Sequence, residues 1–222
     1  MSVSCVVFDL GRTLAYIPSD YDLEQRVASL ARVSKYQIEL AVIRTYLSKL
    51  RMSSEEFIDL FSQKMHEEYC VEQEEVKKIC QESIEKIELQ PDSIHTLDAL
   101  RKLGYKLGLI SNTSPLTKGR LERLGLSRYF DKVVLSCDTG FLKPDPRIFL
   151  YAFSELDVRP EEVCLVGDSI RTLILGGSIL GTNLILIERR MDSVVISEQM
   201  PVDAILPNLS ELPTLIQTLN RA

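Results

Sequence analysis

After Pro91 the sequence alternates between short apolar segments and amphipathic segments, and this alternation constrains the fold more than any other feature. Short strands are expected over residues 105–111, 132–136, 162–168 and 182–187, with a last short strand and a helix within 203–219. Apolar residues recur at helical spacing over 95–104, 116–125, 145–157 and 170–181. A further strand is expected near the start, over residues 3–8. Strands separated by helices are typical of a parallel sheet covered on both faces.

The segment from about residue 21 to residue 89 has a different, wholly helical character. Capping-box patterns begin at Ser34, with Gln37 three residues later, and at Ser53, with Glu56 three residues later. Helices are therefore predicted over 34–50 and 53–69, and a third over 72–89. The sequence predicts an α/β fold: a Rossmann-like parallel sheet core, residues 1–15 and 91–222, with an inserted all-helical cap domain, residues 16–90.

Composition excludes several classes of function. The 222 residues carry 26 basic and 32 acidic side chains, and no long basic stretch offers a footprint for nucleic acid. The five cysteines are scattered without CxxC spacing, which argues against a metal knuckle or a disulfide framework. No signal peptide or membrane-length apolar run is visible, so no membrane partner and a cytoplasmic location are expected. The sequence gives no indication of the oligomeric state.

Polar clusters follow four of the expected strands or the loops beside them. They are Asp9, the pair Ser111 and Asn112, Lys143, and Asp168. Because ligands bind at the carboxyl ends of parallel strands, these side chains are expected to converge on one sheet edge. Any one of them alone is equally explained as a turn cap or a solvated side chain. Together they suit a phosphoryl group.

The chemistry expected of this set is phosphoryl transfer. Asp9 is a candidate nucleophile that attacks phosphorus and forms an aspartyl-phosphate. Asp9 and Asp168 can share a hard divalent cation, most simply Mg²⁺, which neutralises their mutual repulsion. Lys143 and Ser111 can hold the non-bridging phosphate oxygens.

With these motifs in order, the chain resembles the haloacid dehalogenase superfamily along nearly its whole length. "FDLGRTL" is similar to the first motif of that superfamily, "SN" to the second, "GFLKPDPRIF" to the third and "LVGDS" to the fourth. The helical insertion after the first strand resembles its C1 cap. The resemblance implies Asp9 as nucleophile, Ser111 and Asn112 as phosphate ligands and Lys143 as a charge clamp. It also implies that Asp168 and the backbone carbonyl of Gly11 bind Mg²⁺, and that the substrate is a small phosphorylated metabolite.

The resemblance breaks at three positions. Gly11 stands where phosphatases of the superfamily usually carry an acid/base aspartate, Arg12 stands where glycine is usual, and Leu173 falls on a second acidic position of the fourth motif. Losing a general acid/base costs roughly 10²–10⁴ in rate. Arg12 is interpreted either as an anion ligand beside the nucleophile or as a surface arginine. His66 is a weak candidate for the missing acid, should its helix face the cleft.

Three hypotheses about function follow. The first is a Mg²⁺-dependent phosphatase, a phosphoric monoester hydrolase acting through an aspartyl-phosphate. The alternative is a catalytically impaired protein of the same fold that binds phosphate or metal. A 2-haloacid dehalogenase ranks below both, because such enzymes lack the metal-binding aspartate of the fourth motif and carry an acidic residue near the place of Leu173.

Overall fold

The computed structural model describes residues 2–171, 175–189 and 202–221. The strands are β1 (Cys5–Phe8), β2 (Ala15–Tyr16), β3 (Glu88–Leu89), β4 (Lys106–Ser111), β5 (Lys132–Leu135), β6 (Val163–Gly167), β7 (Asn183–Ile187) and β8 (Ala204–Leu206). The α-helices are α1 (Leu23–Ala31), α2 (Lys35–Ser48), α3 (Ser54–Tyr69), α4 (Gln73–Glu85), α5 (Ser93–Lys102), α6 (Leu116–Arg123), α7 (Ser136–Thr139), α8 (Pro146–Leu156), α9 (Leu175–Ser178) and α10 (Leu212–Leu219). Short 3₁₀ turns cover Ser19–Tyr21, Ser127–Tyr129 and Pro160–Glu162.

Six of the strands form one parallel sheet in the order β5-β4-β1-β6-β7-β8, which confirms the predicted α/β core. In the middle of the sheet, Val6 of β1 pairs with Leu107 of β4 and with Cys164 of β6. The chain builds β4 and β5 on one side of β1 and then crosses over to build β6, β7 and β8 on the other side. A reversal of this kind leaves a crevice at the carboxyl ends of the central strands.

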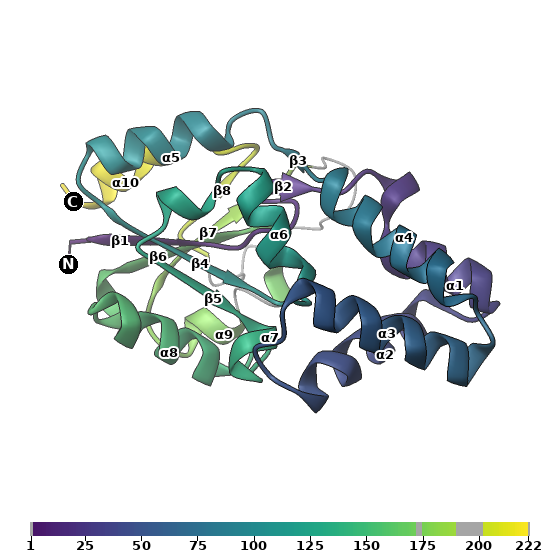
Figure 1. Cartoon of the computed structure of the whole chain (residues 1–222). Coiled ribbons are helices and arrows are strands. Elements are labelled where there is room, and N and C mark those ends of the chain that lie inside the picture. Colours follow the sequence, from purple (N-terminus) through teal and green to yellow (C-terminus); the bar gives the residue numbers. More distant parts are fainter. Residues whose placement is uncertain (1, 172–174, 190–201, 222) are drawn as a thin grey trace.

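Alternating side chains of the strands bury both faces of the sheet. Val6 and Phe8 of β1 pack in the cluster that includes apolar residues of α5 and α10. Cys5 and Val7 pack in the cluster on the other face, against α8. Figure 1 shows these helices as two layers, with α5 and α10 above the strands and α8 and α9 below them. Successive side chains of a strand point to opposite faces of the sheet, and helices cover both faces here. The strands are therefore apolar almost throughout.

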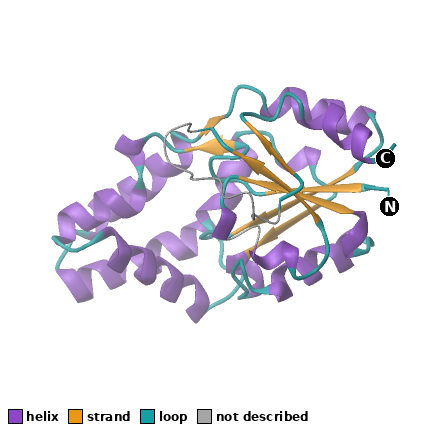
Figure 2. Cartoon of the chain, turned by 180° about the vertical axis from the view of Figure 1, so that it is seen from behind, coloured by secondary structure: helices purple, strands orange, loops and turns teal. Residues whose placement is uncertain are grey.

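The cap consists of helices α1 to α4 and lies at one end of the core, opposite the chain termini (Figures 1 and 2). Both predicted capping boxes are present: Ser34 with Gln37 at the start of α2, and Ser53 with Glu56 at the start of α3. Burial of Tyr46, Phe57 and Phe61 gives the cap an apolar centre of its own, and that cluster continues onto residues of α6 and β5. Among the described helices, none is both long and apolar enough to span a membrane.

One local detail differs from the sequence predictions, and another lies partly outside the described residues. The helix expected over 72–89 ends at Glu85, and the chain then forms β3, which pairs antiparallel with β2 where the cap joins the core (Figure 1). Two-residue strands carry almost no pattern of their own, since their pairing is set by the distant partner. The helix expected over 170–181 is described only as α9, because residues 172–174 lie outside the described part of the chain. The boundaries at residues 15/16 and 90/91 remain a prediction, and both lie next to this ribbon.

Candidate active site

Two carboxylates lie side by side at the carboxyl edge of the sheet. Asp9 directly follows β1, and its backbone N–H donates to the carbonyl of Val166 on the neighbouring strand β6 at 2.8 Å. Asp168 directly follows β6. Burial raises the pKa of the Asp168 carboxyl, the charge of Asp9 raises it further, and Arg12 and Lys143 lower it. The two predicted acidic residues are therefore close enough to repel each other.

Lys143 neutralises Asp9 directly. Its ammonium group donates to Asp9 Oδ1 and, at 2.9 Å, to the carbonyl of Ile110 at the end of β4. The side chain of Lys143 is only 2% exposed, and that of Asp9 is 15% exposed. An ammonium group has three donors, so one remains for a further oxygen such as that of a phosphate. The pair leaves Asp9 Oδ2 as the carboxylate oxygen that Lys143 does not hold.

Asn112 holds the backbone of Lys143 in place. Its Oδ1 accepts from the Lys143 backbone N–H at 2.7 Å, and its Nδ2 donates to the Lys143 carbonyl at 2.8 Å. Its side chain thus joins the end of β4 to the Lys143 loop. Phosphate binding by Asn112 remains a prediction, to which its backbone N–H is better suited than its side chain. Ser111, one residue earlier, is nearly buried and lines the cavity described below.

Asn112→Ala is expected to lower the free energy of unfolding by about 1–3 kcal/mol, since it removes both bonds to Lys143. It should also reduce the turnover of the folded fraction by roughly 10- to 100-fold, because Lys143 loses its fixed position beside Asp9. Urea unfolding and steady-state kinetics measure the two effects. Asn183→Ala is the matched control: Asn183 donates to the carbonyl of Val163 at 3.2 Å, away from this site. Equal turnover in both variants would contradict the positioning role of Asn112.

A glycine allows the segment after Asp168 to pack against the Lys143 loop. A Cβ at Gly176 of α9 would lie 2.8 Å from the backbone carbonyl oxygen of Pro144, the residue after Lys143. No side chain fits at such a distance without a shift of the backbone. The close packing of α9 therefore joins the segment after Asp168 to the loop that carries Lys143.

Arg12 binds the second carboxylate. Its Nε lies 2.7 Å from Asp168 Oδ2, and the side chain of Arg12 is 67% exposed while that of Asp168 is 14% exposed. The sequence analysis interpreted Arg12 as an anion ligand or a surface arginine, and the structure pairs this exposed side chain with the Asp168 carboxylate. The described site therefore holds two ion pairs, Lys143 with Asp9 and Arg12 with Asp168.

Of three other residues that the sequence analysis discussed, the structure places two, and the third lies outside the described residues. Gly11 is exposed, and a Cβ at this residue would meet nothing within 4 Å. His66 lies near the end of α3, where its Nδ1 is 3.2 Å from the carbonyl oxygen of Val71, and it does not line the cavity near Asp9. Leu173 lies outside the described residues.

Thr13 carries an unusual buried hydroxyl. Its Oγ1 is fully buried and finds no hydrogen-bond partner among the described residues. Unpaired buried polar atoms are rare in folded proteins and occur in catalytic or ligand-binding segments. Thr13 lies in the segment that also carries Asp9, Gly11 and Arg12.

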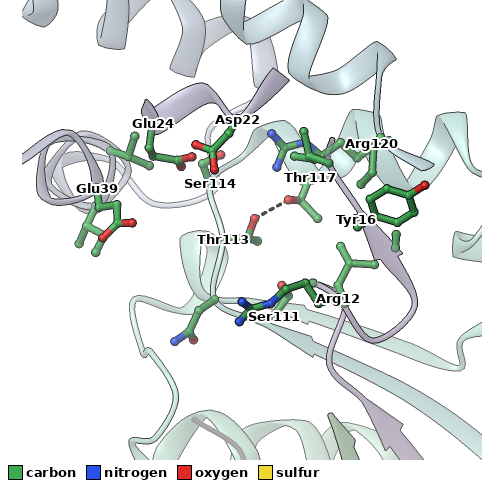
Figure 3. Close-up of a pocket in the computed structure, with 18 of the residues that line it drawn as sticks. Arg12, Tyr16, Asp22, Glu24, Glu39, Ser111, Thr113, Ser114, Thr117 and Arg120 are labelled. Atoms are coloured by element: carbon green, nitrogen blue, oxygen red, sulfur yellow. Dashed lines mark hydrogen bonds between the residues drawn. The ribbon is translucent and has the colours of Figure 1, made fainter. Parts of the chain in front are cut away.

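A cavity of about 620 Å³ opens between the cap and the core (Figure 3). Its core wall includes residues 10–12 and 111–114, and its cap wall includes residues of α1 and α2. Asp9, Lys143 and Asp168 do not themselves line it, but Leu10 and Leu142, the neighbours of Asp9 and Lys143 in sequence, do. The volume suits a small metabolite. A phosphate at Asp9 would leave the remainder of its ester in this space.

Cap and core both contribute charged residues to the cavity that the sequence analysis did not identify. Glu24 of α1 and Arg120 of α6 both line it. Burial raises the pKa of the Glu24 carboxyl, and the charge of Arg120 lowers it in part. Asp22 and Lys35, also in the lining, form an ion pair at 2.5 Å. No motif marks these residues, because only the packing of the cap on the core brings them together.

The donors at this sheet edge fit Mg²⁺. This ion binds oxygen, commonly one or two carboxylates together with waters and a phosphate of the substrate. Asp9 and Asp168 supply two adjacent carboxylates, and no cluster of three acidic, histidine or cysteine side chains occurs within the described residues. Gly11 is exposed and its carbonyl remains the predicted third protein ligand. The donor set is thus of the kind that leaves room for water and phosphate.

Comparisons with known proteins give a consistent picture. A family model described as haloacid dehalogenase-like hydrolase matches residues 3–178. The chain is 39% identical to a glyceraldehyde 3-phosphate phosphatase from Methanopyrus kandleri over 100 residues, which are 45% of this chain and 43% of that protein. It is 30% identical to (S)-2-haloacid dehalogenase 1 from Pseudomonas sp. strain CBS-3 over 152 residues, 68% of this chain and 66% of that protein. The matched part spans a little under half the length of the first curated relatives.

The fold has solved counterparts over nearly its full length. The crystal structure of an HAD phosphatase from Thermococcus onnurineus covers 97% of this chain and 98% of its own, with a TM-score of 0.67 and 28% identity. The likeness extends over both the sheet core and the helical cap.

Proposed function

The chain belongs to the haloacid dehalogenase-like hydrolases, and on this premise we propose that it is a Mg²⁺-dependent phosphatase of a small phosphorylated metabolite. The observation that carries the proposal is the buried ion pair between Lys143 and Asp9, with Asp168 on the adjacent strand. A lysine of this kind fixes one oxygen of the nucleophile and still has a donor for phosphate. The phosphatase from Methanopyrus kandleri and the phosphatase from Thermococcus onnurineus support the same reaction class.

In the proposed first step, Asp9 Oδ2 attacks phosphorus while Lys143 holds Oδ1. The ester P–O bond breaks, its electron pair leaves with the alcohol oxygen, and an aspartyl-phosphate remains on Asp9. Ser111 and the backbone N–H of Asn112 donate to the phosphate oxygens. In the second step water attacks the aspartyl-phosphate, which releases phosphate and restores the carboxylate.

Asp9, Asp168 and the carbonyl of Gly11 are the groups that would hold Mg²⁺. Bound there, the ion would neutralise charge that develops on the phosphoryl oxygens. Lys143 adds a second positive charge from within the core, so that phosphate meets cationic groups from two directions. Catalysis of phosphoryl transfer relies mainly on such positioning and charge.

Gly11 is the reason why we expect a low rate of hydrolysis. The residue provides no proton for the leaving oxygen and no base for the attacking water. Esters whose leaving group is already a weak base should therefore react best. The second step should be slow as well, so that phosphorylated Asp9 accumulates.

Hydrolysis of p-nitrophenyl phosphate tests the proposal directly. With Mg²⁺ we expect a burst of about one nitrophenolate per chain followed by slow turnover, and acid quenching should trap a phosphorylated protein. EDTA should remove both signals, and added Mg²⁺ should restore them. Turnover that is equal with Mg²⁺ and with EDTA would contradict the proposal.

Binding without turnover is a second candidate function, favoured by the absence of an acid at Gly11. In that case calorimetry would detect binding of Mg²⁺ and of inorganic phosphate to the protein, while neither a burst nor turnover would occur with any ester. A 2-haloacid dehalogenase would instead release chloride from 2-chloropropionate in the presence of EDTA, because halide leaves without a proton. The same protein preparation serves all three assays.

A further inference from the structure

We infer that Arg12 is a built-in counter-cation of Asp168, which competes with Mg²⁺ for this carboxylate and weakens metal binding. The inference concerns the metal of the proposed phosphatase and so rests in part on that function. It is carried by the position of one side chain: the Nε of Arg12 lies 2.7 Å from Asp168 Oδ2. A guanidinium there occupies a carboxylate oxygen that a metal ligand would need.

Arg12 lies on the cavity side of Asp168. Arg12 lines the cavity between cap and core (Figure 3), whereas Asp168 does not. We therefore expect a cation that enters from the cavity to meet the guanidinium before it reaches Asp168. Asp9, the other carboxylate, is neutralised from the core side by Lys143. Each acidic side chain of the site thus has one basic partner within the chain.

The backbone directs Arg12 toward this position. Its φ is 57°, in the left-handed region that disfavours residues with a Cβ. Its N–H donates to the carbonyl of Ala15 at 2.7 Å, and its carbonyl accepts from Gln90 Nε2 and from Arg189 Nε. Arg189 is fixed in turn by an ion pair with Asp92 at 2.8 Å. A strained residue held by this many contacts is typical of a functional site.

The ion pair and the metal exclude each other for electrostatic reasons. A divalent cation on Asp168 would lie within a few ångströms of the guanidinium, and two like charges at that separation repel strongly. The guanidinium must therefore move into the cavity before the ion binds. The side chain of Arg12 is 67% exposed, so this movement breaks one ion pair of the weakly stabilising, exposed kind. Mg²⁺ can therefore displace the guanidinium, at a cost in affinity.

Calorimetric titration with MgCl₂ measures the competition without reference to turnover. Arg12→Gly and Arg12→Asn both remove the charge, and both residues tolerate a positive φ. We expect each to bind Mg²⁺ about two- to fivefold more tightly than the unmodified protein. Arg12→Lys, which keeps a positive charge, should bind Mg²⁺ more weakly than either neutral variant. Asp168→Asn should lose the binding.

Arg32→Gly is the matched control. Arg32 has a φ of 56°, is exposed, and caps the C-terminus of α1 without lining the cavity. This variant separates relief of backbone strain from loss of charge at the site, and its affinity for Mg²⁺ should be unchanged.

The outcomes separate the inference from the proposed function. Tighter Mg²⁺ binding in both neutral Arg12 variants supports the inference even where no ester is hydrolysed, in which case only the phosphatase proposal fails. Unchanged affinity in Arg12→Gly and Arg12→Asn overturns the inference, and Mg²⁺-dependent turnover would still stand. Tighter binding in Arg12→Gly alone also overturns it, because the effect would then come from the backbone.

Discussion

Replacing Asp9 by asparagine is expected to reduce phosphoryl transfer by roughly 10⁴- to 10⁶-fold, the scale seen when a covalent nucleophile is removed. The amide oxygen can still accept from Lys143, so the shape of the site is retained. The amide lacks the negative charge that attack on phosphorus requires. Nitrophenolate release and acid-trapped phosphoprotein should therefore fall together.

Asp98→Asn is a suitable control for this prediction. Asp98 is an exposed aspartate on α5, outside the cavity, and its replacement removes the same charge. Thermal unfolding of both variants shows whether the fold is intact. Residual turnover of more than a few per cent in Asp9→Asn would mean that another group attacks the phosphate, and the aspartyl-phosphate route would have to be abandoned.

The core of the fold was predictable because its signals are local. The apolar runs at residues 105–111 and 162–168 are buried strands β4 and β6, and the capping boxes at Ser34 and Ser53 begin α2 and α3. The β2–β3 ribbon was not predicted, since two residues of strand depend on a partner far along the chain. Local pattern specifies the layers, whereas the junction between cap and core depends on tertiary pairing.

The site was predictable as a set of residues but not as a set of contacts. Strand ends place Asp9 and Asp168 at one edge, and the loop after α7 brings Lys143 to Asp9. The bridge from Asn112 to the Lys143 backbone requires the exact course of two loops. The ion pair of Arg12 depends on a positive φ that no pattern in the sequence indicates. Roles that follow from motif position were accessible, and roles that follow from loop geometry were not.

Gly11 offers a direct way to test why the site is expected to be slow. The residue is exposed, its φ lies outside the left-handed region, and a Cβ there would meet no atom within 4 Å. An aspartate therefore fits without displacing the loop. Its carboxyl would lie two residues from Asp9, on the segment that lines the cavity where the leaving group is expected.

Gly11→Asp is expected to raise the hydrolysis of an alkyl phosphate such as glycerol phosphate by roughly 10²- to 10⁴-fold, the usual contribution of a general acid/base. The gain with p-nitrophenyl phosphate should be smaller in the first step, since nitrophenolate leaves without a proton. The burst should also disappear, because the new carboxylate activates the water that hydrolyses the aspartyl-phosphate. Gly11→Asn, equal in size but unable to transfer a proton, should gain nothing. If both variants behave alike, the missing acid is not what limits this enzyme, whereas a gain that vanishes in Asp9→Asn/Gly11→Asp shows that the restored group works through Asp9.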